Sequence, residues 1–182
     1  SHSHPNGVNE LNGVNVNLRT VEEIKAVLAA KAATTPPGFW VRGYMYDDTK
    51  LDRPVTRVDL DEAVPNHLAS VGHRGGHTGV YNSMALALAG VTAETPDPDD
   101  GKFYRDSNGV LTGLVAERAR RVFDGLIPSG STREQRRDGV KLISELMTKA
   151  GLTSIQQTGG GRNDMIAFQD ARAAGDMRFR VT

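Results

Sequence analysis

Two histidines separated by a single residue, His2 and His4, point more directly to chemistry than any other part of this chain. The side chains of a β-strand alternate between its two faces, so on a strand both imidazoles lie on the same face. Imidazole nitrogen is a common ligand of zinc and related divalent metals, which usually take three or four protein ligands. The pair therefore predicts part of a metal site, unless these histidines are simply solvated residues near a terminus.

The other histidines, His67, His73 and His77, fall within one short region of the chain. We expect a helix after His77, and this residue could cap it. His73 and its neighbour Arg74 are interpreted as solvated loop residues. Nothing after His77 resembles a metal-ligand set.

A second candidate is the run Gly159, Gly160 and Gly161, followed by Arg162. It falls between an expected strand and an expected helix, where backbone N–H groups at a helix N-terminus can hold a phosphate. The spacing matches neither the Walker A motif nor the dinucleotide-binding fingerprint. Binding of a phosphate ligand at this turn is kept as a separate hypothesis.

Composition narrows the class of partner. The chain has 22 basic and 22 acidic residues, so no charge excess favours nucleic acid or an anionic membrane surface. It has no cysteine, which excludes disulfides and thiolate ligands and leaves nitrogen and oxygen donors for any metal. No stretch approaches the ~20 apolar residues of a membrane span. We expect a soluble, cytoplasmic protein with a small-molecule ligand.

The elements that must position these residues alternate between helix and strand. Thr20 and Glu23 form a capping-box pattern before a helix that ends at Pro36, and Ser131 with Glu134 predicts another before a long helix. Asn-Gly at residues 108–109 predicts a hairpin. Helices are expected within residues 21–35, 57–64, 78–89, 114–123, 132–150 and 163–174, and strands near 2–4, 39–46, 68–72, 103–105, 110–112, 152–156 and 177–181.

The order of these elements predicts an α/β protein with an insertion. The last segment runs helix, strand, helix, strand, which is typical of a parallel sheet with crossover helices. Residues 39–127 break that order with short strands and a hairpin. We therefore expect three segments, 1–38, 39–127 and 128–182, in which the first strand and the strand at 152–156 share one sheet.

Four blocks carry a resemblance to a known family. They are His-Ser-His-Pro at residues 2–5, Trp-Val-Arg-Gly-Tyr at 40–44, Gly-His-Thr-Gly-Val-Tyr-Asn-Ser-Met-Ala-Leu at 76–86, and the segment 106–113. In order and rough spacing they resemble the N-terminal part of amidohydrolase family 3. This branch of the metal-dependent amidohydrolase superfamily includes N-substituted formamide deformylases.

The resemblance implies a fold and a set of roles. The fold is a distorted (β/α) TIM barrel, of which this chain supplies a partial segment, the first strands only, with residues 39–127 as an inserted α+β subdomain. His2 and His4 match the two histidines that bind a divalent metal at the end of the first strand, and His77 matches a histidine that contacts substrate. The metal is expected to polarise a carbonyl and to lower the pKa of a water to about 7 for attack on an amide-type C–N bond.

The chain also departs from the family pattern. Family members carry further site residues on later strands, namely a lysine or carboxylate, two more histidines and a catalytic aspartate, and a complete barrel needs about 250 residues. We therefore expect an N-terminal hydrolase fragment, inactive in isolation, with no catalytic residue of its own. Zinc is the expected metal of the parent protein, and none need be bound in this chain. Gly75 is a further departure, since the family often has aspartate there.

A different class of function is the alternative. The chain could be a non-catalytic interaction or regulatory module derived from the amidohydrolase fold. An open partial barrel leaves parallel strand edges exposed, and proteins usually pair or cover such edges. Self-association is expected under either interpretation.

Overall fold

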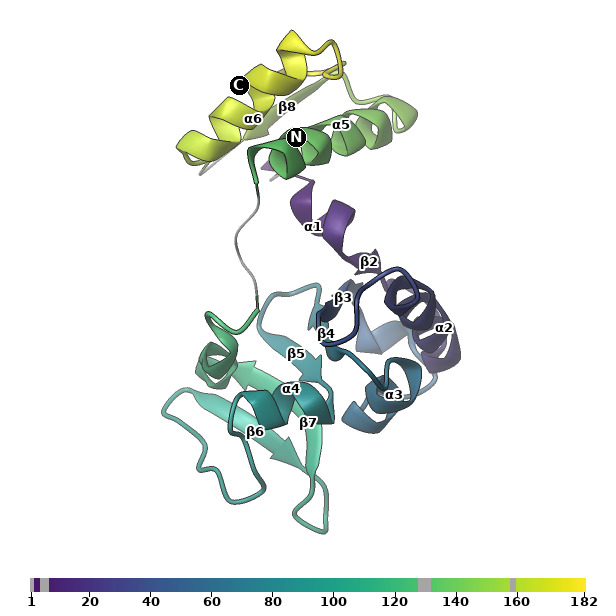
Figure 1. Cartoon of the computed structure of the whole chain (residues 1–182), viewed down its shortest axis with the longest axis vertical. Coiled ribbons are helices and arrows are strands. Elements are labelled where there is room, and N and C mark those ends of the chain that lie inside the picture. Colours follow the sequence, from purple (N-terminus) through teal and green to yellow (C-terminus); the bar gives the residue numbers. More distant parts are fainter. Residues whose placement is uncertain (1, 4–6, 128–131, 158–159) are drawn as a thin grey trace. The chain divides into compact units, whose positions relative to one another are not determined.

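The computed structural model of the chain describes residues 2–3, 7–127, 132–157 and 160–182. These residues form two compact units, one from residues 1–12 with 129–182 and the other from residues 13–128 (Figure 1). Both units contain helices and strands, which confirms the predicted α/β class. Among the described residues, no helix combines the length and apolar character that crossing a bilayer requires.

The smaller unit is a three-stranded sheet with helices α5 and α6 packed together beside it. Its elements are β1 (His2–Ser3), α1 (Val8–Asn12), α5 (Arg133–Lys149), β8 (Ser154–Gln157), α6 (Arg162–Ala173) and β9 (Arg180–Val181). The sheet order is β1-β8-β9, and both pairings are parallel. The prediction that the first strand shares a sheet with the strand near residues 152–156 is therefore confirmed.

The helix ends of the smaller unit differ from the expected ones. Helix α5 is capped by the hydroxyl of Thr132, which accepts from the N–H of Gln135 at 3.1 Å, one residue later than the predicted pair. Ser131 lies outside the described residues. Helix α6 begins after Gly161 rather than at Asn163, because the Asp164 carboxylate accepts the Gly161 N–H at 2.9 Å and fixes the first turn there.

The larger unit is built on a six-stranded mixed sheet of order β2-β3-β4-β5-β7-β6. Its strands are β2 (Val14–Asn15), β3 (Trp40–Tyr46), β4 (Leu68–His73), β5 (Thr78–Tyr81), β6 (Gly101–Arg105) and β7 (Leu111–Glu117). Its helices are α2 (Val21–Ala32), α3 (Arg57–Ala63) and α4 (Ser83–Leu88), with 3₁₀ turns at Asp48–Lys50 and Arg118–Phe123. Strands β2, β3 and β4 are parallel, and the remaining pairings are antiparallel.

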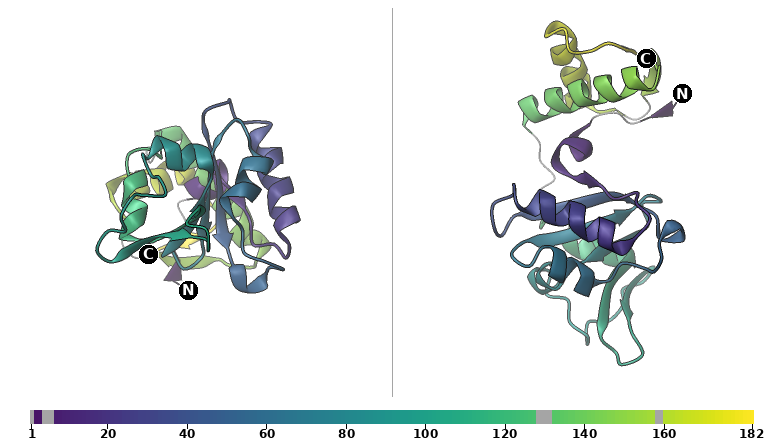
Figure 2. Two further views of the ribbon diagram at one scale, coloured as in Figure 1. Left: turned by 90° about the horizontal axis from the view of Figure 1, so that it is seen from below. Right: turned by 90° about the vertical axis from the view of Figure 1, so that its right-hand side faces the viewer.

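In the larger unit, capping residues start helices α2 and α3 where the sequence predicts. At α2, the Thr20 hydroxyl accepts from the Glu23 N–H at 3.2 Å, and the Glu23 carboxylate accepts the Thr20 N–H at 3.0 Å. At α3, the buried Asp59 carboxylate accepts the Thr56 N–H at 2.8 Å. Helices α2 and α3 lie side by side (Figure 2). Their apolar side chains join one core with β3 and β4: Val21, Ile24, Leu28, Val41, Leu60, Val64, Ala69 and Val71.

Asp59 also forms an ion pair that matters for stability. Its two oxygens accept from the Arg53 guanidinium at 2.6 and 2.8 Å. Burial raises the pKa of the Asp59 carboxyl, but the hydrogen bonds from Arg53 and Thr56 outweigh burial and lower it to about 2. The carboxylate therefore stays charged in the folded protein and ties the start of α3 to the segment before it.

Two predicted helices begin too early in the sequence. Residues 78–81 form β5 before the short helix α4, and residues 114–117 complete β7 before a 3₁₀ turn. The antiparallel register joins Gly79 to Val115 and Val80 to Leu114, so each segment finds its backbone partner in the other. This long-range pairing overrides the helical preference of the leucine and alanine residues nearby.

The boundary between the two compact units differs from the predicted segment boundaries at one place. Residues 13–38, which were grouped with the first strand of the parallel sheet, contain β2 and α2 and belong to the larger unit. The division of the chain into barrel and inserted segments stays a prediction.

A substitution at Gly113 tests the packing of β7. Gly113 has φ +92°, and a Cβ there would lie 2.6 Å from the Tyr81 carbonyl oxygen and 2.7 Å from Arg57 Cβ. We expect Gly113→Ala to lower the free energy of unfolding by about 3 kcal/mol. Gly109→Ala is the matched control, because Gly109 has φ +79° but nothing lies near its Cβ position, so only about 1 kcal/mol is expected. Urea denaturation measures both, and equal losses would contradict the steric argument.

Candidate functional site

The carboxyl edge of the smaller sheet is the first candidate site. His2 pairs with Gln156 and Ser3 with Gln157 in parallel register, so the chain leaves β1 and β8 at the same edge. This is the edge at which open α/β sheets bind ligands. A cavity of about 360 Å³ lies beside it, and Gln157, Gly160 and Thr182 are among its lining residues.

The structure places only part of the predicted metal pair. His2 lies on β1, as the argument from alternating side chains requires, whereas His4 lies outside the described residues. Two imidazoles at a strand end are the kind of donor that zinc and related metals bind, so these residues fit part of such a site. Metal binding by His2 and His4 stays a prediction.

His77 lies in the larger unit, directly before β5, and faces a carboxylate. Its Nδ1 is 3.0 Å from Oε1 and 3.2 Å from Oε2 of Glu117. The Glu117 N–H also donates to the His77 carbonyl oxygen at 2.8 Å. Since a strand rather than a helix follows His77, the interpretation of this residue as a helix cap is wrong. Its side chain is 71% exposed, which leaves the ring accessible to a ligand.

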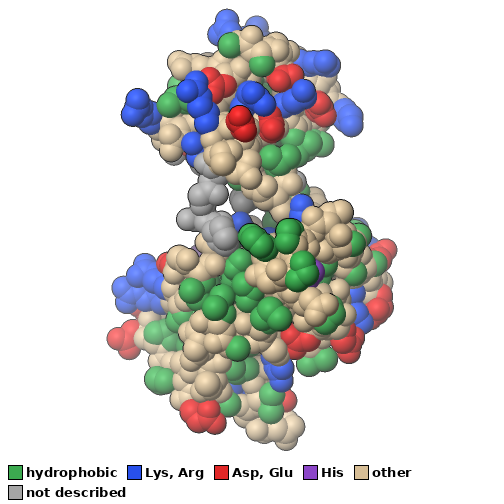
Figure 3. All heavy atoms as spheres, viewed as in Figure 1, with side chains coloured by type: hydrophobic (Ala, Val, Ile, Leu, Met, Phe, Trp, Pro, Cys, Tyr) green, Lys and Arg blue, Asp and Glu red, His purple; other side chains and the backbone are tan. Residues whose placement is uncertain are grey.

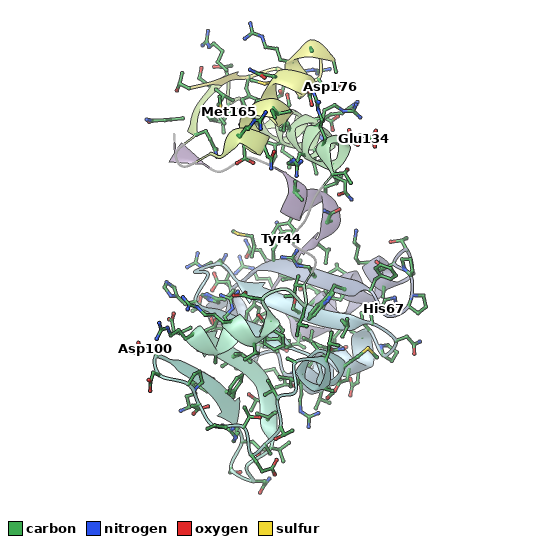
Figure 4. The ribbon with its side chains drawn as sticks, turned by 60° about the vertical axis from the view of Figure 1, so that its left-hand side comes forward. Tyr44, His67, Asp100, Glu134, Met165 and Asp176 are labelled. Atoms are coloured by element: carbon green, nitrogen blue, oxygen red, sulfur yellow. The ribbon has the colours of Figure 1, made fainter. Side chains whose placement is uncertain are left out.

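His67 has a structural role in this fold. It lies just before β4, and its side chain is buried (Figure 4). Its Nε2 donates to the Thr35 carbonyl oxygen at 2.8 Å, while Nδ1 is buried without a hydrogen-bond partner. The ring therefore links the start of β4 to the loop that follows α2.

Asp47, Asp48 and His73 form a cluster whose ligand atoms lie within 4.8 Å of one another. Both ring nitrogens of His73 are occupied, because Nε2 lies 3.3 Å from Asp48 Oδ1 and Nδ1 accepts the Gly75 N–H at 3.0 Å. The ring also packs edge-on against Tyr46. His73 is therefore an ordered residue at the end of β4, and its interpretation as a solvated loop residue is wrong.

The charge of the buried Asp47 carboxylate is already balanced. The Thr49 hydroxyl donates to its Oδ1 at 2.6 Å, and its Oδ2 lies 3.1 Å from Arg74 Nε and 3.4 Å from Lys50 Nζ. Oδ2 lacks a well-aligned hydrogen bond, yet these two cations stand within ion-pair distance. The Thr49 hydroxyl and the cations lower the pKa of Asp47. A third cation would be repelled here, so the cluster is an ion-pair network rather than a metal centre.

The glycine turn before α6 is not arranged for phosphate. Gly159 lies outside the described residues, and Gly161 is the N-cap of α6. The Asp164 carboxylate occupies the position at this N-terminus that an anion would take, and its charge repels a phosphate. The structure disfavours the phosphate-binding hypothesis.

Glu117 is a residue that sequence reasoning missed. It lies within residues 114–123, where a helix was expected. The structure instead places it at the end of β7, opposite His77. No local pattern could have revealed this, because the contact depends on the pairing of β5 with β7.

Comparison with known sequences identifies similar proteins. The family model described as "Amidohydrolase family" matches residues 1–182. The chain is 32% identical over 173 residues to an N-substituted formamide deformylase of Arthrobacter pascens, covering 90% of this chain and 31% of that protein. It is 28% identical over 170 residues to the putative amidohydrolase YtcJ of Bacillus subtilis, covering 90% and 32%.

Solved structures show the same fold at lower identity. An uncharacterized metal-dependent hydrolase from Pyrococcus horikoshii aligns with a TM-score of 0.61 and 21% identity, over 100% of this chain and 34% of that one. Another, from Pyrococcus furiosus, aligns with a TM-score of 0.60 and 23% identity, over 100% and 36%. The chain therefore spans about a third of the length of each of these proteins.

Proposed function

Because the chain belongs to the amidohydrolase family, we propose that it is the N-terminal part of a metal-dependent hydrolase that cleaves amide-type C–N bonds. The observation that carries the proposal is the parallel pairing of β1 with β8, which brings the strand of His2 to a ligand-binding sheet edge. The relative named as a formamide deformylase supports the bond type.

The proposed architecture is the beginning of a (β/α) barrel. Strands β1, β8 and β9 with helices α5 and α6 have the parallel order and crossover helices of such a barrel. The larger unit is then the inserted subdomain, and it begins near residue 13 rather than residue 39. Exposed strand edges of this parallel sheet support self-association as a further part of the proposal.

Each candidate residue has a proposed task. His2 and His4 hold a divalent metal, with zinc favoured by their imidazole donors. When bound, the metal supplies Lewis-acid polarisation of the scissile carbonyl and a lowered pKa of water. His77 contacts the substrate through its exposed ring. The remaining ligands and the catalytic aspartate are assigned to parts of the enzyme beyond the segment matched here.

The substrate is proposed to be a small molecule. Charged side chains of both signs are spread over the drawn face of each unit (Figure 3), and the chain as a whole has 22 basic and 22 acidic residues. Such a surface has no concentrated positive potential that would attract a polyanion. The non-catalytic module is not favoured, because the formamide deformylase and both solved structures are named as enzymes.

Metal removal tests the proposal. We expect the enzyme that carries this chain to hydrolyse N-substituted formamides or simple amides, and to lose about a thousandfold in rate after dialysis against a chelator. Adding back zinc is expected to restore the rate. The measurement is product amine released over time. Hydrolysis that is unchanged after verified removal of all metal would contradict the proposal.

A further inference from the structure

His77 and Glu117 are held opposite each other by two independent sets of contacts. The strand register pairs Thr78 with Ala116, so the two residues lie at matching positions across β5 and β7. Their main chains are joined by a hydrogen bond of 2.8 Å, and their side chains approach to 3.0 Å. Arg120 fixes the segment before His77, because its guanidinium donates to the Gly76 carbonyl oxygen.

The backbone of Glu117 is strained. It has φ 51° and ψ −128°, a conformation that glycine dominates in type II′ turns and that other L residues avoid. Strain of this kind persists only where the surroundings enforce it, and it gathers at functional sites. Here it occurs at the residue whose carboxylate meets His77.

The contribution of the His77–Glu117 pair to folding stability does not explain the strained geometry that holds it. The side chains of His77 and Glu117 are 71% and 55% exposed, and exposed ion pairs contribute little to stability. The ion pair therefore does not stabilise the folded chain enough to offset the free-energy cost of the strained Glu117 backbone. What the pair does control is the state of the imidazole ring.

The contact selects one form of the neutral ring. A carboxylate only accepts hydrogen bonds, so the neutral His77 ring must carry its hydrogen on Nδ1, which leaves Nε2 with a free lone pair. Within the described part of the chain, Nε2 of His77 has no hydrogen-bond partner. The other two described rings have the opposite form, since Nε2 donates to Thr35 in His67 and Nδ1 accepts the Gly75 N–H in His73.

We infer that Glu117 is a positioning residue that holds His77 with hydrogen on Nδ1, so that Nε2 accepts a hydrogen bond from an N–H or O–H group of the substrate. This inference rests on the proposed function, in which His77 contacts an amide-type substrate. An amide that bears an N–H on its scissile nitrogen is a donor of the required kind.

The test reads the ring directly and needs neither metal nor substrate. Long-range ¹H–¹⁵N spectra distinguish the two neutral forms of each histidine, and they are recorded at about pH 8.5, above the ordinary histidine pKa of about 6.5. The His77 signals are assigned by their loss in His77→Ala. We expect His77 to show the Nδ1–H form, with His67 and His73 in the Nε2–H form as internal references.

Variants at residue 117 complete the test. Glu117→Ala is expected to shift the ratio of the Nδ1–H form to the Nε2–H form of neutral His77 about fivefold toward Nε2–H. Glu117→Gly removes the same carboxylate without backbone strain, so it gives the same spectral change and raises the unfolding midpoint by about 4 °C. Arg118→Ala is the matched control and leaves the ratio unchanged.

Three results would overturn the inference. They are an Nε2–H ring for His77 in the unaltered chain, no change in Glu117→Gly, or an equal change in Arg118→Ala. Because the spectra involve no turnover, they can fail while the enzyme is still a metal-dependent hydrolase. Conversely, an enzyme without hydrolytic activity would defeat the proposed function and leave the measured ring form standing.

Discussion

Replacing both His2 and His4 by alanine is expected to lower the rate of amide hydrolysis about a thousandfold in the enzyme that carries this chain. If His2 and His4 hold the metal as proposed, the two substitutions remove its imidazole donors and with them a Lewis-acid contribution worth several kcal/mol. Each factor of ten in rate corresponds to about 1.4 kcal/mol. Product formation at saturating substrate measures the effect, and bound metal is counted by elemental analysis.

Ser3→Ala is the matched control for that variant. Ser3 lies between the two histidines in the sequence and pairs with Gln157 on β8, so its substitution alters the same segment without removing an imidazole. We expect Ser3→Ala to keep its metal and its rate. If the double histidine variant retains both metal and full activity, His2 and His4 are not ligands.

The second large effect is expected at Asp59. Replacing it by alanine removes the carboxylate that accepts from Arg53 at 2.6 and 2.8 Å and from the Thr56 N–H at 2.8 Å. We expect a loss of about 3 kcal/mol in the free energy of unfolding. This is the lower end of the range for breaking a buried ion pair, because the Arg53 side chain is half exposed and its guanidinium can be hydrated when Asp59 is removed. The loss is measured by urea denaturation at pH 7.

The contacts of the Asp59 carboxylate also make the free energy of unfolding depend on pH in the acidic range. The Asp59 pKa is about 2 in the folded chain against an ordinary 3.8, so its contribution is present above about pH 4 and is lost as the pH falls toward 2. This difference corresponds to about 2 kcal/mol. Asp59→Asn keeps the size of the side chain and an acceptor for the cap, and is expected to lose this acid-dependent part. If the stability of Asp59→Asn falls between pH 4 and 2 by as much as that of the unaltered chain, other carboxylates cause the effect.

Features set by neighbouring residues were predictable from the sequence. The capping box of Thr20 and Glu23 starts α2 as expected, and Asn108-Gly109 turns the hairpin between β6 and β7. The pairing of β1 with β8 was also predicted, since the alternation of helix and strand after residue 128 favours a parallel sheet. The cap and the hairpin depend on local contacts, whereas the β1–β8 pairing joins distant segments but follows from a pattern repeated along the chain.

The features that were missed depend on contacts between distant segments. Strand β5 was taken for the start of a helix because Val80, Met84, Leu86 and Leu88 follow a helical pattern, whereas its pairing with β7 decides its conformation. The same pairing brings Glu117 to His77, which no pattern near either residue indicates. The site at the end of β1 was proposed from its residue types and from family resemblance, and its ligand role stays a prediction.

The pairing of β1 with β8 also bears on how the chain folds as it leaves the ribosome. Residues 13–128 are contiguous, so the larger unit can form all its internal contacts before the rest of the chain is made. Strand β1 is synthesised before the larger unit, yet its partner Ser154–Gln157 comes about 150 residues after it. At 5–20 residues per second, β1 waits roughly 8–30 s for that partner. During that interval its backbone is an unpaired strand edge, open to chaperones and to other nascent chains.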